Sequence, residues 1–495
     1  MVRTFRFARL ICRAFLTLLF VSFHISAGSN VHADIIVTNA NVRTMNARLP
    51  VAQAFAVAGN RISAVGTNKA IQRLAGPNTR VINASGRLVL PGFNDAHVHF
   101  MGIGNSFSSL DLREVKSVKE IAERIGRYAR FLPKNRWILG GGWHSELWKG
   151  HETPDIKLID AVSPSNPVFL YSSDAKSAIA SALALKQAGI KNETDSGTVV
   201  TGEKLKKTAS AVPENHTRNW TEIAETATNY AASLGVTSVQ DMHSDDSREV
   251  YRELQRQGKL KTRIYDCVPL PDWKKLAGAE RQPGEMVRGG CLKSFSDGDE
   301  ESVSRLLKDV LPADRAGFQI MVHAIGGSAN NIVLGVFEQA AKANGARDRR
   351  FRIEHAYEPQ SDDLARFLKS NVIASMQPFL FDGGTGGRYR TLLALGARIA
   401  FGSDAAITDF DPLLGIHAAV NAGSESISVH DAVRAYTVGS AYAEFQERDK
   451  GTIETGKLAD FVILSDDIFA ININAIRRTS VLLTVMDGKV VFEAE

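Results

Sequence analysis

The stretch LPGFNDAHVHF, residues 90–100, places two histidines one residue apart behind an apolar run and a Pro-Gly pair. In an extended strand, residues i and i+2 point to the same side, so His97 and His99 can reach one point beyond the strand end. Such a point suits a metal ion. A bare H-x-H pair is more often two ordinary surface histidines than a pair of ligands, so the rest of the chain must decide between these interpretations.

From this stretch onward the chain alternates predicted strands with predicted helices, a pattern typical of a parallel sheet with crossover helices. The eight strand candidates read LVLPGFNDAH, VTSVQDM, KTRIYDCVPL, GCLKSFSDG, FQIMVHAIG, FRIEHA, NVIASMQPF and RIAFGSDA. Eight such units predict the α/β class and a (β/α)₈ TIM barrel over residues 91–445. The long excursion over residues 100–234 contains the aromatic and glycine-rich RWILGGGWHSELWKG, which favours a structured insertion over a linker.

Both ends of the chain show a different pattern of short, alternating strands. Gly59-Asn60 and Asp487-Gly488 fit hairpin turns between such strands. We therefore expect residues 34–90 and 446–495 to form one small composite β-sandwich domain.

The first 33 residues resemble a signal peptide. Four arginines precede or enter the apolar stretch AFLTLLFVSFHI, and the segment ends in small residues that suit cleavage near Ala33. A retained N-terminal anchor is the alternative. Cleavage predicts a periplasmic or secreted protein with no stable membrane span.

Removal of this segment also changes the charge of the chain. The formal charge of +5 falls by the four arginines to +1, which gives no reason to expect a nucleic-acid partner. The mature chain keeps Cys267 and Cys291, either as a disulfide or as two buried thiols.

Polar side chains follow five of the predicted barrel strands. In this architecture the reacting groups gather at the carboxyl ends of the strands. The candidates there are His97, His99, Lys293, His323, His355 and Asp404. Any one of them alone would be an unremarkable structural residue, but six in register at strand ends indicate a site.

The motifs LPGFNDAHVH, GVTSVQD, LKSFSDG, VHAIGG, FRIEHA, SMQP, FGSDA and GKLADFVILSDD, spread from about Ile35 to the C-terminus, resemble the amidohydrolase superfamily of metal-dependent hydrolases. More narrowly they resemble amidohydrolase family 3, the group that includes N-substituted formamide deformylase. The resemblance implies a barrel with a composite β-sandwich, in agreement with the pattern above.

The resemblance also implies roles for the six candidates. His97, His99 and Asp404 would hold one divalent metal, His323 and His355 a second, and a carbamylated Lys293 would bridge them. Imidazole and carboxylate ligands favour Zn²⁺, with manganese and iron still open. Two cations that share a water activate it as a nucleophile, and Asp404 would move its proton to the leaving group.

The implied activity is hydrolysis of a carbon–nitrogen, non-peptide, amide-type bond in a small molecule. Lactone, ester or phosphotriester hydrolysis on the same scaffold stays open, as does a non-catalytic periplasmic protein that binds metal or solute. Against the latter, a pure binding protein needs no proton shuttle such as Asp404. A homo-oligomer is compatible with the sequence.

Two departures from the family pattern fall near the expected substrate pocket. Lys176 stands where many relatives have the histidine of a DGH motif, and Gly327 replaces the acid of HAIGD. Substrate contacts are expected from the insertion and from the glycine-rich segment FDGGTGGRYR. The candidates are Trp143, His144, Lys176 and Arg388. Trp143 and Trp148 are equally well explained as core residues of the insertion.

Overall fold

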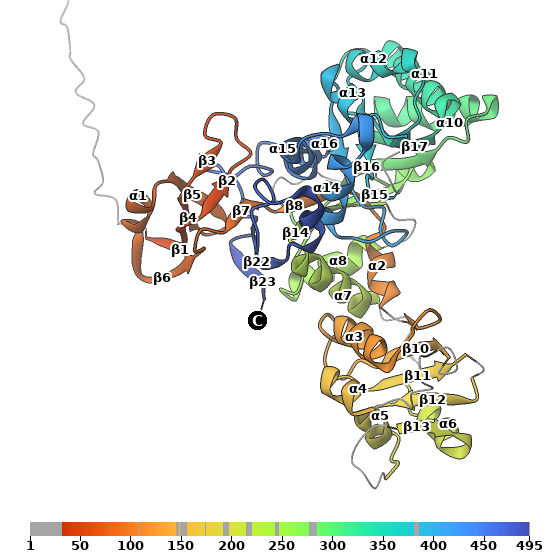
Figure 1. Ribbon diagram of the computed structural model, residues 1–495. Helices are drawn as coiled ribbons and strands as arrows, with labels where there is room; N and C mark the ends of the chain where they lie inside the picture. The colour runs from red at the N-terminus through yellow and green to blue at the C-terminus, as the bar shows by residue number, and fades with distance from the viewer. Residues whose placement is uncertain are drawn as a thin grey trace, which may run out of the picture.

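The computed structural model has three units: a barrel, an inserted α/β unit and a β-sandwich (Figure 1). It describes residues 32–107, 109–144, 148, 156–173, 175–191, 198–213, 220–242, 247–276, 285–380 and 386–494. The predicted signal segment lies outside these residues apart from its last two. In the described part of the chain, no helix has both the length and the apolar character needed to cross a bilayer.

The barrel is the eight-stranded sheet, in the order β20-β19-β18-β17-β16-β15-β14-β8, and all its strand pairs are parallel. The first and last strands of this order meet at a seam, where the Asp404 N–H donates to the His97 carbonyl at 2.8 Å. The predicted barrel is thereby confirmed. Its strands are β8 (Phe93–Val98), β14 (Val236–Met242), β15 (Arg263–Pro269), β16 (Val287–Phe295), β17 (Gln319–Ile325), β18 (Arg352–Tyr357), β19 (Ile373–Met376) and β20 (Ile399–Phe401).

Helices between these strands cover the outside of the barrel. The helix α10 is an example. Asp299 caps its N-terminus, because the Asp299 carboxylate accepts from the Ser302 N–H at 2.8 Å, and the helix buries Leu306 and Val310 against the barrel core. The helices of this unit are α2 (Phe100–Ser106), α7 (Trp220–Ser233), α8 (Ser247–Arg256), η3 (Leu270–Asp272), α9 (Trp273–Leu276), α10 (Glu300–Arg315), α11 (Gly327–Asn344), α12 (Ser361–Lys369), α13 (Tyr389–Ala394), α14 (Pro412–Val420), η4 (Gly423–Glu425), α15 (Val429–Arg434), η5 (Ala435–Gly439), α16 (Ser440–Ala443) and η6 (Ile473–Arg478).

The single strand expected over LVLPGFNDAH is two strands in the structure. β7 (Leu88–Pro91) belongs to the sandwich and β8 to the barrel, and Gly92 joins them. A side chain at Gly92 would collide with Thr237 of β14, so the chain can pass between the two units only at a glycine. Gly92 thus connects the sandwich directly to the strand that carries His97.

The sandwich combines strands from both ends of the chain, as the sequence predicted. Its sheets run β5-β4-β1-β6 and β23-β22-β21-β7-β2-β3. Phe55 from the first sheet meets Phe461 from the second, with ring centroids 4.8 Å apart. Both predicted hairpins form at the predicted turns. Besides β7, the sandwich contains β1 (Ala33–Thr38), β2 (Asn41–Arg43), β3 (Val51–Ala52), β4 (Ala54–Ala58), β5 (Arg61–Gly66), α1 (Asn68–Gln72), β6 (Ala75–Asn83), β21 (Phe461–Leu464), β22 (Val481–Met486) and β23 (Lys489–Glu493).

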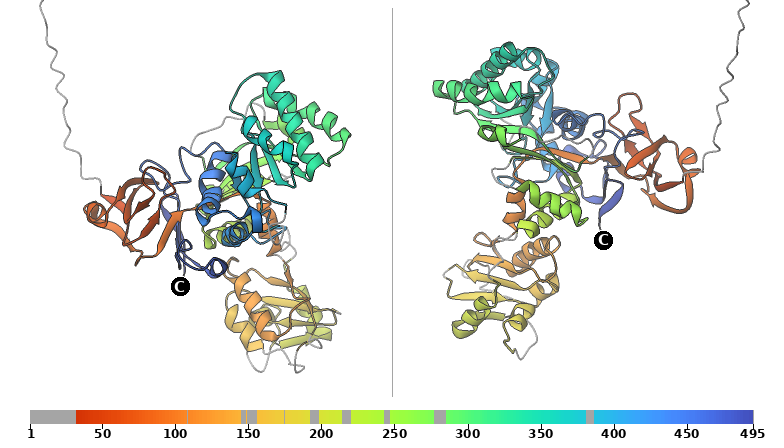
Figure 2. Two further views of the ribbon diagram at one scale, coloured as in Figure 1. Left: turned by 45° about the horizontal axis from the view of Figure 1, so that its top comes forward. Right: turned by 180° about the vertical axis from the view of Figure 1, so that it is seen from behind.

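The insertion is a folded unit with its own five-stranded sheet, which extends from the barrel next to α2 and α7 (Figures 1 and 2). An aromatic cluster joins the two units: the Tyr230 ring lies 5.1 Å from Phe107 and 4.9 Å from Phe131. The elements are β9 (Leu110–Asp111), α3 (Val118–Ala129), β10 (Ile138–Trp143), α4 (Ile156–Val162), β11 (Val168–Ser172), β12 (Ser177–Ala180), α5 (Ala182–Gln187), β13 (Thr198–Thr201) and α6 (Gly202–Ser210).

The two cysteines whose state the sequence left open form a disulfide. Cys267 on β15 and Cys291 on β16 are register partners, and both are fully buried. Lys293 follows two residues after Cys291, so the disulfide crosslinks the two strands just before the strand end that carries this lysine.

Candidate metal centre

The six side chains predicted at the strand ends gather at the mouth of the barrel. Ligand atoms of His97, His355 and Asp404 all lie within 4.8 Å of one another. His97 Nε2 and His99 Nε2 each lie 3.4 Å from Asp404 Oδ1, and Lys293 Nζ lies 3.4 Å from His97 Nε2. The His323 ring packs edge-on against His355, with centroids 4.5 Å apart. Residues from five strands of the barrel thus meet within one small volume.

His97 is held in one orientation by a buried ion pair. Its Nδ1 donates to Glu354 Oε2 at 2.6 Å, and Arg352 donates to both oxygens of the same carboxylate, at 2.8 and 3.1 Å. Because a carboxylate only accepts, the proton of His97 sits on Nδ1 and the Nε2 lone pair faces the cluster. Arg352 is fixed in turn by the Gln240, Ser375 and Ala96 oxygens.

Sequence reasoning missed Glu354, and the backbone explains why. Adjacent residues of a strand point to opposite faces, so a residue next to His355 should face away from the site. In the structure His355 and Ala356 have positive φ values of 72° and 47°, and the register of β18 against β17 shifts at this point. This β-bulge turns the chain so that Glu354 and His355 both face the cluster. The motif RIEHA was the available signal.

His355 has a neutral partner instead of a charged one. Its Nδ1 lies 2.7 Å from the Gln377 side-chain oxygen, so its Nε2 also faces the cluster. Burial, with Lys293 and then His323 nearby, lowers the pKa of His355 to about 4. Burial likewise lowers the pKa of His97 and of His323. These three imidazoles are therefore neutral at physiological pH, which is the form that binds a metal.

Asp404 lies at the centre of the cluster with a strained backbone, at φ 62°. Burial tends to raise the pKa of its carboxyl group, but the contact with His99, whose Nε2 lies 3.4 Å from Oδ1, and the nearby His97 and His355 outweigh burial and lower the pKa. The buried oxygen Oδ1 has no hydrogen-bond partner among the described residues. An ionised carboxylate oxygen without a partner, facing imidazole lone pairs, fits a divalent cation.

Lys293 is almost fully buried in the same volume. Burial lowers its pKa to about 8, while Glu354 and Asp404 act in the opposite direction. An ammonium group cannot bind a cation, so a role for Lys293 as a ligand requires its neutral amine or a carbamate made from it.

A second residue that sequence reasoning missed, Asp95, holds the seam next to the cluster. It is fully buried on β8, and its Oδ1 accepts from the backbone N–H of His97 at 3.0 Å and of Ser403 at 3.1 Å. Burial raises the pKa of Asp95 to about 7. Asp95 thus ties the strand that carries His97 to the turn that carries Asp404.

Comparison with known proteins identifies the family. The sequence profile described as the amidohydrolase family matches residues 80–492. The chain belongs to the amidohydrolase family. Like the solved structure of an uncharacterised metal-dependent hydrolase from Pyrococcus furiosus, this amidohydrolase has the barrel with an added β domain: the two are 25% identical, with a TM-score of 0.62, over 88% of this chain and 99% of that one.

Two curated proteins are similar over nearly their whole length. Protein LONG AFTER FAR-RED 3 of Arabidopsis thaliana is 32% identical over 93% of this chain and 92% of its own. N-substituted formamide deformylase of Arthrobacter pascens is 27% identical over 93% of this chain and 98% of its own. Membership makes the chain a hydrolase of a metal-dependent family, and the buried cluster is where a divalent ion fits.

The structure of this amidohydrolase gives a different result for the residues predicted to contact the substrate than for the predicted metal ligands. Trp143 is buried in the core of the insertion beside Trp148, and its indole N–H donates to the Leu170 carbonyl at 2.9 Å. The expectation that Trp143 contacts substrate is therefore corrected: its ring fills the insertion core. His144 and Lys176 lie in the insertion, His144 with its Nδ1 2.9 Å from the Ser173 hydroxyl.

Arg388 belongs to the barrel and precedes α13. Its guanidinium lies 3.6 Å from the carboxylate of Glu425 in η4. The preceding part of the glycine-rich segment, residues 381–385, lies outside the described residues. The structure therefore brings all six ligand candidates together and places Trp143 in the insertion core, whereas substrate contacts by His144, Lys176 and Arg388 stay predictions.

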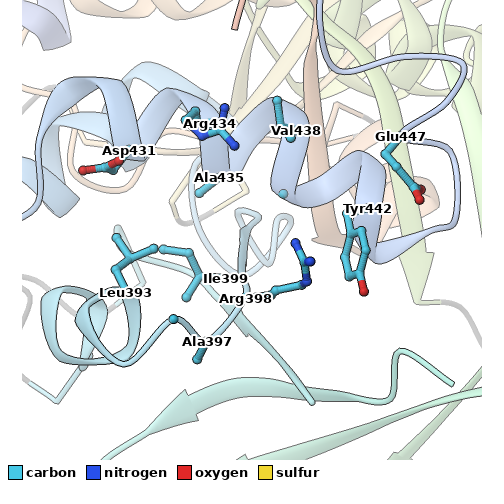
Figure 3. A pocket seen from close by; sticks show the side chains of 12 residues that line it. Leu393, Ala397, Arg398, Ile399, Asp431, Arg434, Ala435, Val438, Tyr442 and Glu447 are labelled. Carbon is cyan, nitrogen blue, oxygen red and sulfur yellow. The ribbon is translucent and has the colours of Figure 1, made fainter. Parts of the chain in front are cut away.

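A cavity of about 470 Å³ lies at the opposite end of β20 from Asp404 (Figure 3). Arg398, Tyr442 and Glu447 lie at one side of it and Asp431 and Arg434 at the other. The remaining lining residues are Leu393, Gly396, Ala397, Ile399, Ala435, Val438 and Gly439. Because it opens at the amino ends of the barrel strands, this cavity is not part of the reaction site.

Proposed function

We propose that this amidohydrolase is an exported enzyme that cleaves a carbon–nitrogen, amide-type bond in a small molecule. The observation that carries the proposal is the unpartnered, buried oxygen of Asp404 among neutral histidines. The relative named N-substituted formamide deformylase supports an N-substituted amide as the bond type.

We further propose two divalent ions, most simply Zn²⁺. His97, His99 and Asp404 would hold one and His323 and His355 the other, with Lys293 between them as a carbamate. When bound, such ions polarise the scissile carbonyl and make a water molecule acidic. The geometry supports Lys293 in the bridging place, because its Nζ lies 3.4 Å from His97 Nε2.

The side chains of the protein then have separate tasks. Glu354 and Gln377 hold the Nδ1 protons of His97 and His355, so that both Nε2 atoms face the ions. Asp404 has a lowered pKa and is ionised at neutral pH, so it can accept a proton from water. Passing that proton to the leaving nitrogen makes an amine, a far better leaving group than an amide anion.

The test is Asp404→Asn, assayed for zinc content and turnover on one sample, with a panel of N-substituted amides, lactones and phosphotriesters. We expect much of the zinc to remain and turnover of the best substrate to fall about 10²–10⁴-fold, the usual contribution of a positioned acid–base group. A fully zinc-loaded variant with near-normal turnover would contradict the proton-transfer role. Turnover of lactones or phosphotriesters alone would replace the proposed bond type.

Export is supported by two independent features. The arginine-rich, apolar N-terminal segment fits a signal peptide, and a buried disulfide is typical of proteins that fold in an oxidising compartment. N-terminal sequencing of the protein from its natural host tests this: a mature chain beginning near Asp34 is expected, and one beginning at Met1 would refute it.

A further inference from the structure

Three large apolar side chains are exposed at the mouth of the barrel. Phe295, Ile325 and Ile407 have 54%, 40% and 68% of their surface open. Phe295 is the last residue of β16, two positions after Lys293, and Ile325 is the last residue of β17, two positions after His323. Ile407 lies in the turn after Asp404, and its N–H donates to the Asp404 carbonyl at 2.9 Å. Each follows a ligand candidate by two or three residues.

The barrel order places these side chains around the cluster rather than on one side of it. β16 and β17 are neighbours, whereas β20 lies four strands from β16 in a barrel of eight, which is the opposite wall. Phe295 also contacts the site itself: its ring lies 5.5 Å from the His323 ring, and Lys293 Nζ lies 4.9 Å from its centroid. A molecule held over the ligands would thus have Phe295 and Ile325 on one side and Ile407 on the other.

Single exposed apolar residues are normal on a protein surface and need no explanation. Three that flank one cluster of buried polar groups are different, because ligand sites combine apolar walls with a few convergent polar groups. We propose that Phe295, Ile325 and Ile407 form an apolar collar that selects substrates with an alkyl or aryl group next to the scissile bond. The proposal rests on the proposed function and specifies its substrate class.

The test uses straight-chain hydroxamic acids, from acetohydroxamic to octanohydroxamic acid, as probes of the zinc-loaded full chain. Their head group chelates zinc whether or not the enzyme hydrolyses amides, so binding by calorimetry reports the collar separately from turnover. Each methylene buried in the collar should tighten binding about fourfold, the usual gain for a CH₂ group removed from water.

Phe295→Ser and Ile407→Ser should each reduce this gain from about fourfold per methylene towards no gain. Because the gain is a ratio between acids of different chain length, any change in head-group binding common to all of them cancels. Leu368→Ser is the matched control, because Leu368 is 53% exposed on α12 and away from the mouth. It should keep the wild-type gain. Since all three positions are exposed, thermal melting should show the variants folded.

Two results would overturn the collar while leaving the metal centre intact: binding that does not depend on chain length in the wild type, or an equal loss in Leu368→Ser. A failure of every hydroxamic acid to bind, acetohydroxamic acid included, would overturn the metal centre and the collar with it.

Discussion

The buried carboxylate of Glu354 gives the sharpest test of how the metal centre is built. In Glu354→Gln the side chain keeps its shape but has one oxygen for the two positions that now accept from His97 and Arg352. If the amide oxygen faces His97, the amide N–H₂ meets the Arg352 Nε–H. If it turns the other way, His97 loses its acceptor. Either arrangement leaves a buried donor unpaired.

The structure separates two consequences of this change. Glu354 and Arg352 are both fully buried, so removing one charge leaves the other uncompensated, and the free energy of unfolding should fall by about 3–5 kcal/mol. His97 also loses the partner that fixes its tautomer, and such losses typically weaken metal binding about 10–100-fold. The first effect is measured by urea denaturation of the metal-free protein, and the second by competition with a chromophoric zinc chelator.

Asp314→Asn is the matched control. Asp314 is a buried carboxylate on α10 that accepts from Arg347 and Arg349 and lies outside the metal cluster. Its loss should lower stability by a similar amount without changing zinc affinity. Zinc affinity of Glu354→Gln within threefold of wild type, or an equal loss in Asp314→Asn, would refute the assignment of Glu354 as a positioning residue.

Three further predictions concern metal content, pH and the insertion. Lys293→Ala should release about one of two zinc ions, measured by elemental analysis; unchanged content would mean that Lys293 is no ligand. The pKa of His355 is about 4 folded and near 6.5 unfolded, so the unfolded chain takes up a proton first as pH falls, and the metal-free protein should lose stability between about pH 6.5 and 4. The denaturation midpoint of metal-free His355→Asn should not fall over this pH range as the wild-type midpoint does. A pH profile identical to that of the wild type would contradict the prediction. Trp143→Ala should cost about 3–5 kcal/mol by denaturation yet leave the ratio of rates between substrates unchanged, because Trp143 is a core residue; a changed ratio would restore its role at the substrate.

The barrel was predictable because each of its strands is a short apolar run, and because five of them are followed by a polar residue at the same end. The same logic found all six ligand candidates. It failed at Glu354 because strand alternation cannot anticipate a bulge, which only the positive φ values of His355 and Ala356 reveal. Gln377 was missed for a simpler reason: an uncharged residue in the motif SMQP carries no signal of its own.

Trp143 is a different case, because the sequence left two roles open for it, a substrate contact and a core residue, and the structure places its ring in the core. The aromatic, glycine-rich stretch around Trp143 suggested a structured insertion whose side chains contact the substrate. In the structure Gly140 lies within β10, where a side chain would collide with the backbone of Leu110 on β9. The glycines allow strands to approach, and the aromatic rings fill the resulting core.

The composite sandwich has a consequence for the order in which the molecule is assembled. Leu90 of β7 pairs with Val462 of β21, so one edge of β7 has no partner until about 370 more residues have been made. At ordinary rates of synthesis this delay is roughly 20 to 75 s. Throughout that time the edge can pair with any other extended chain, because unpaired strand edges are templates for aggregation. A chain that has not yet been made as far as β21 therefore exposes this edge of β7, and the sandwich can close only once the C-terminal strands are present.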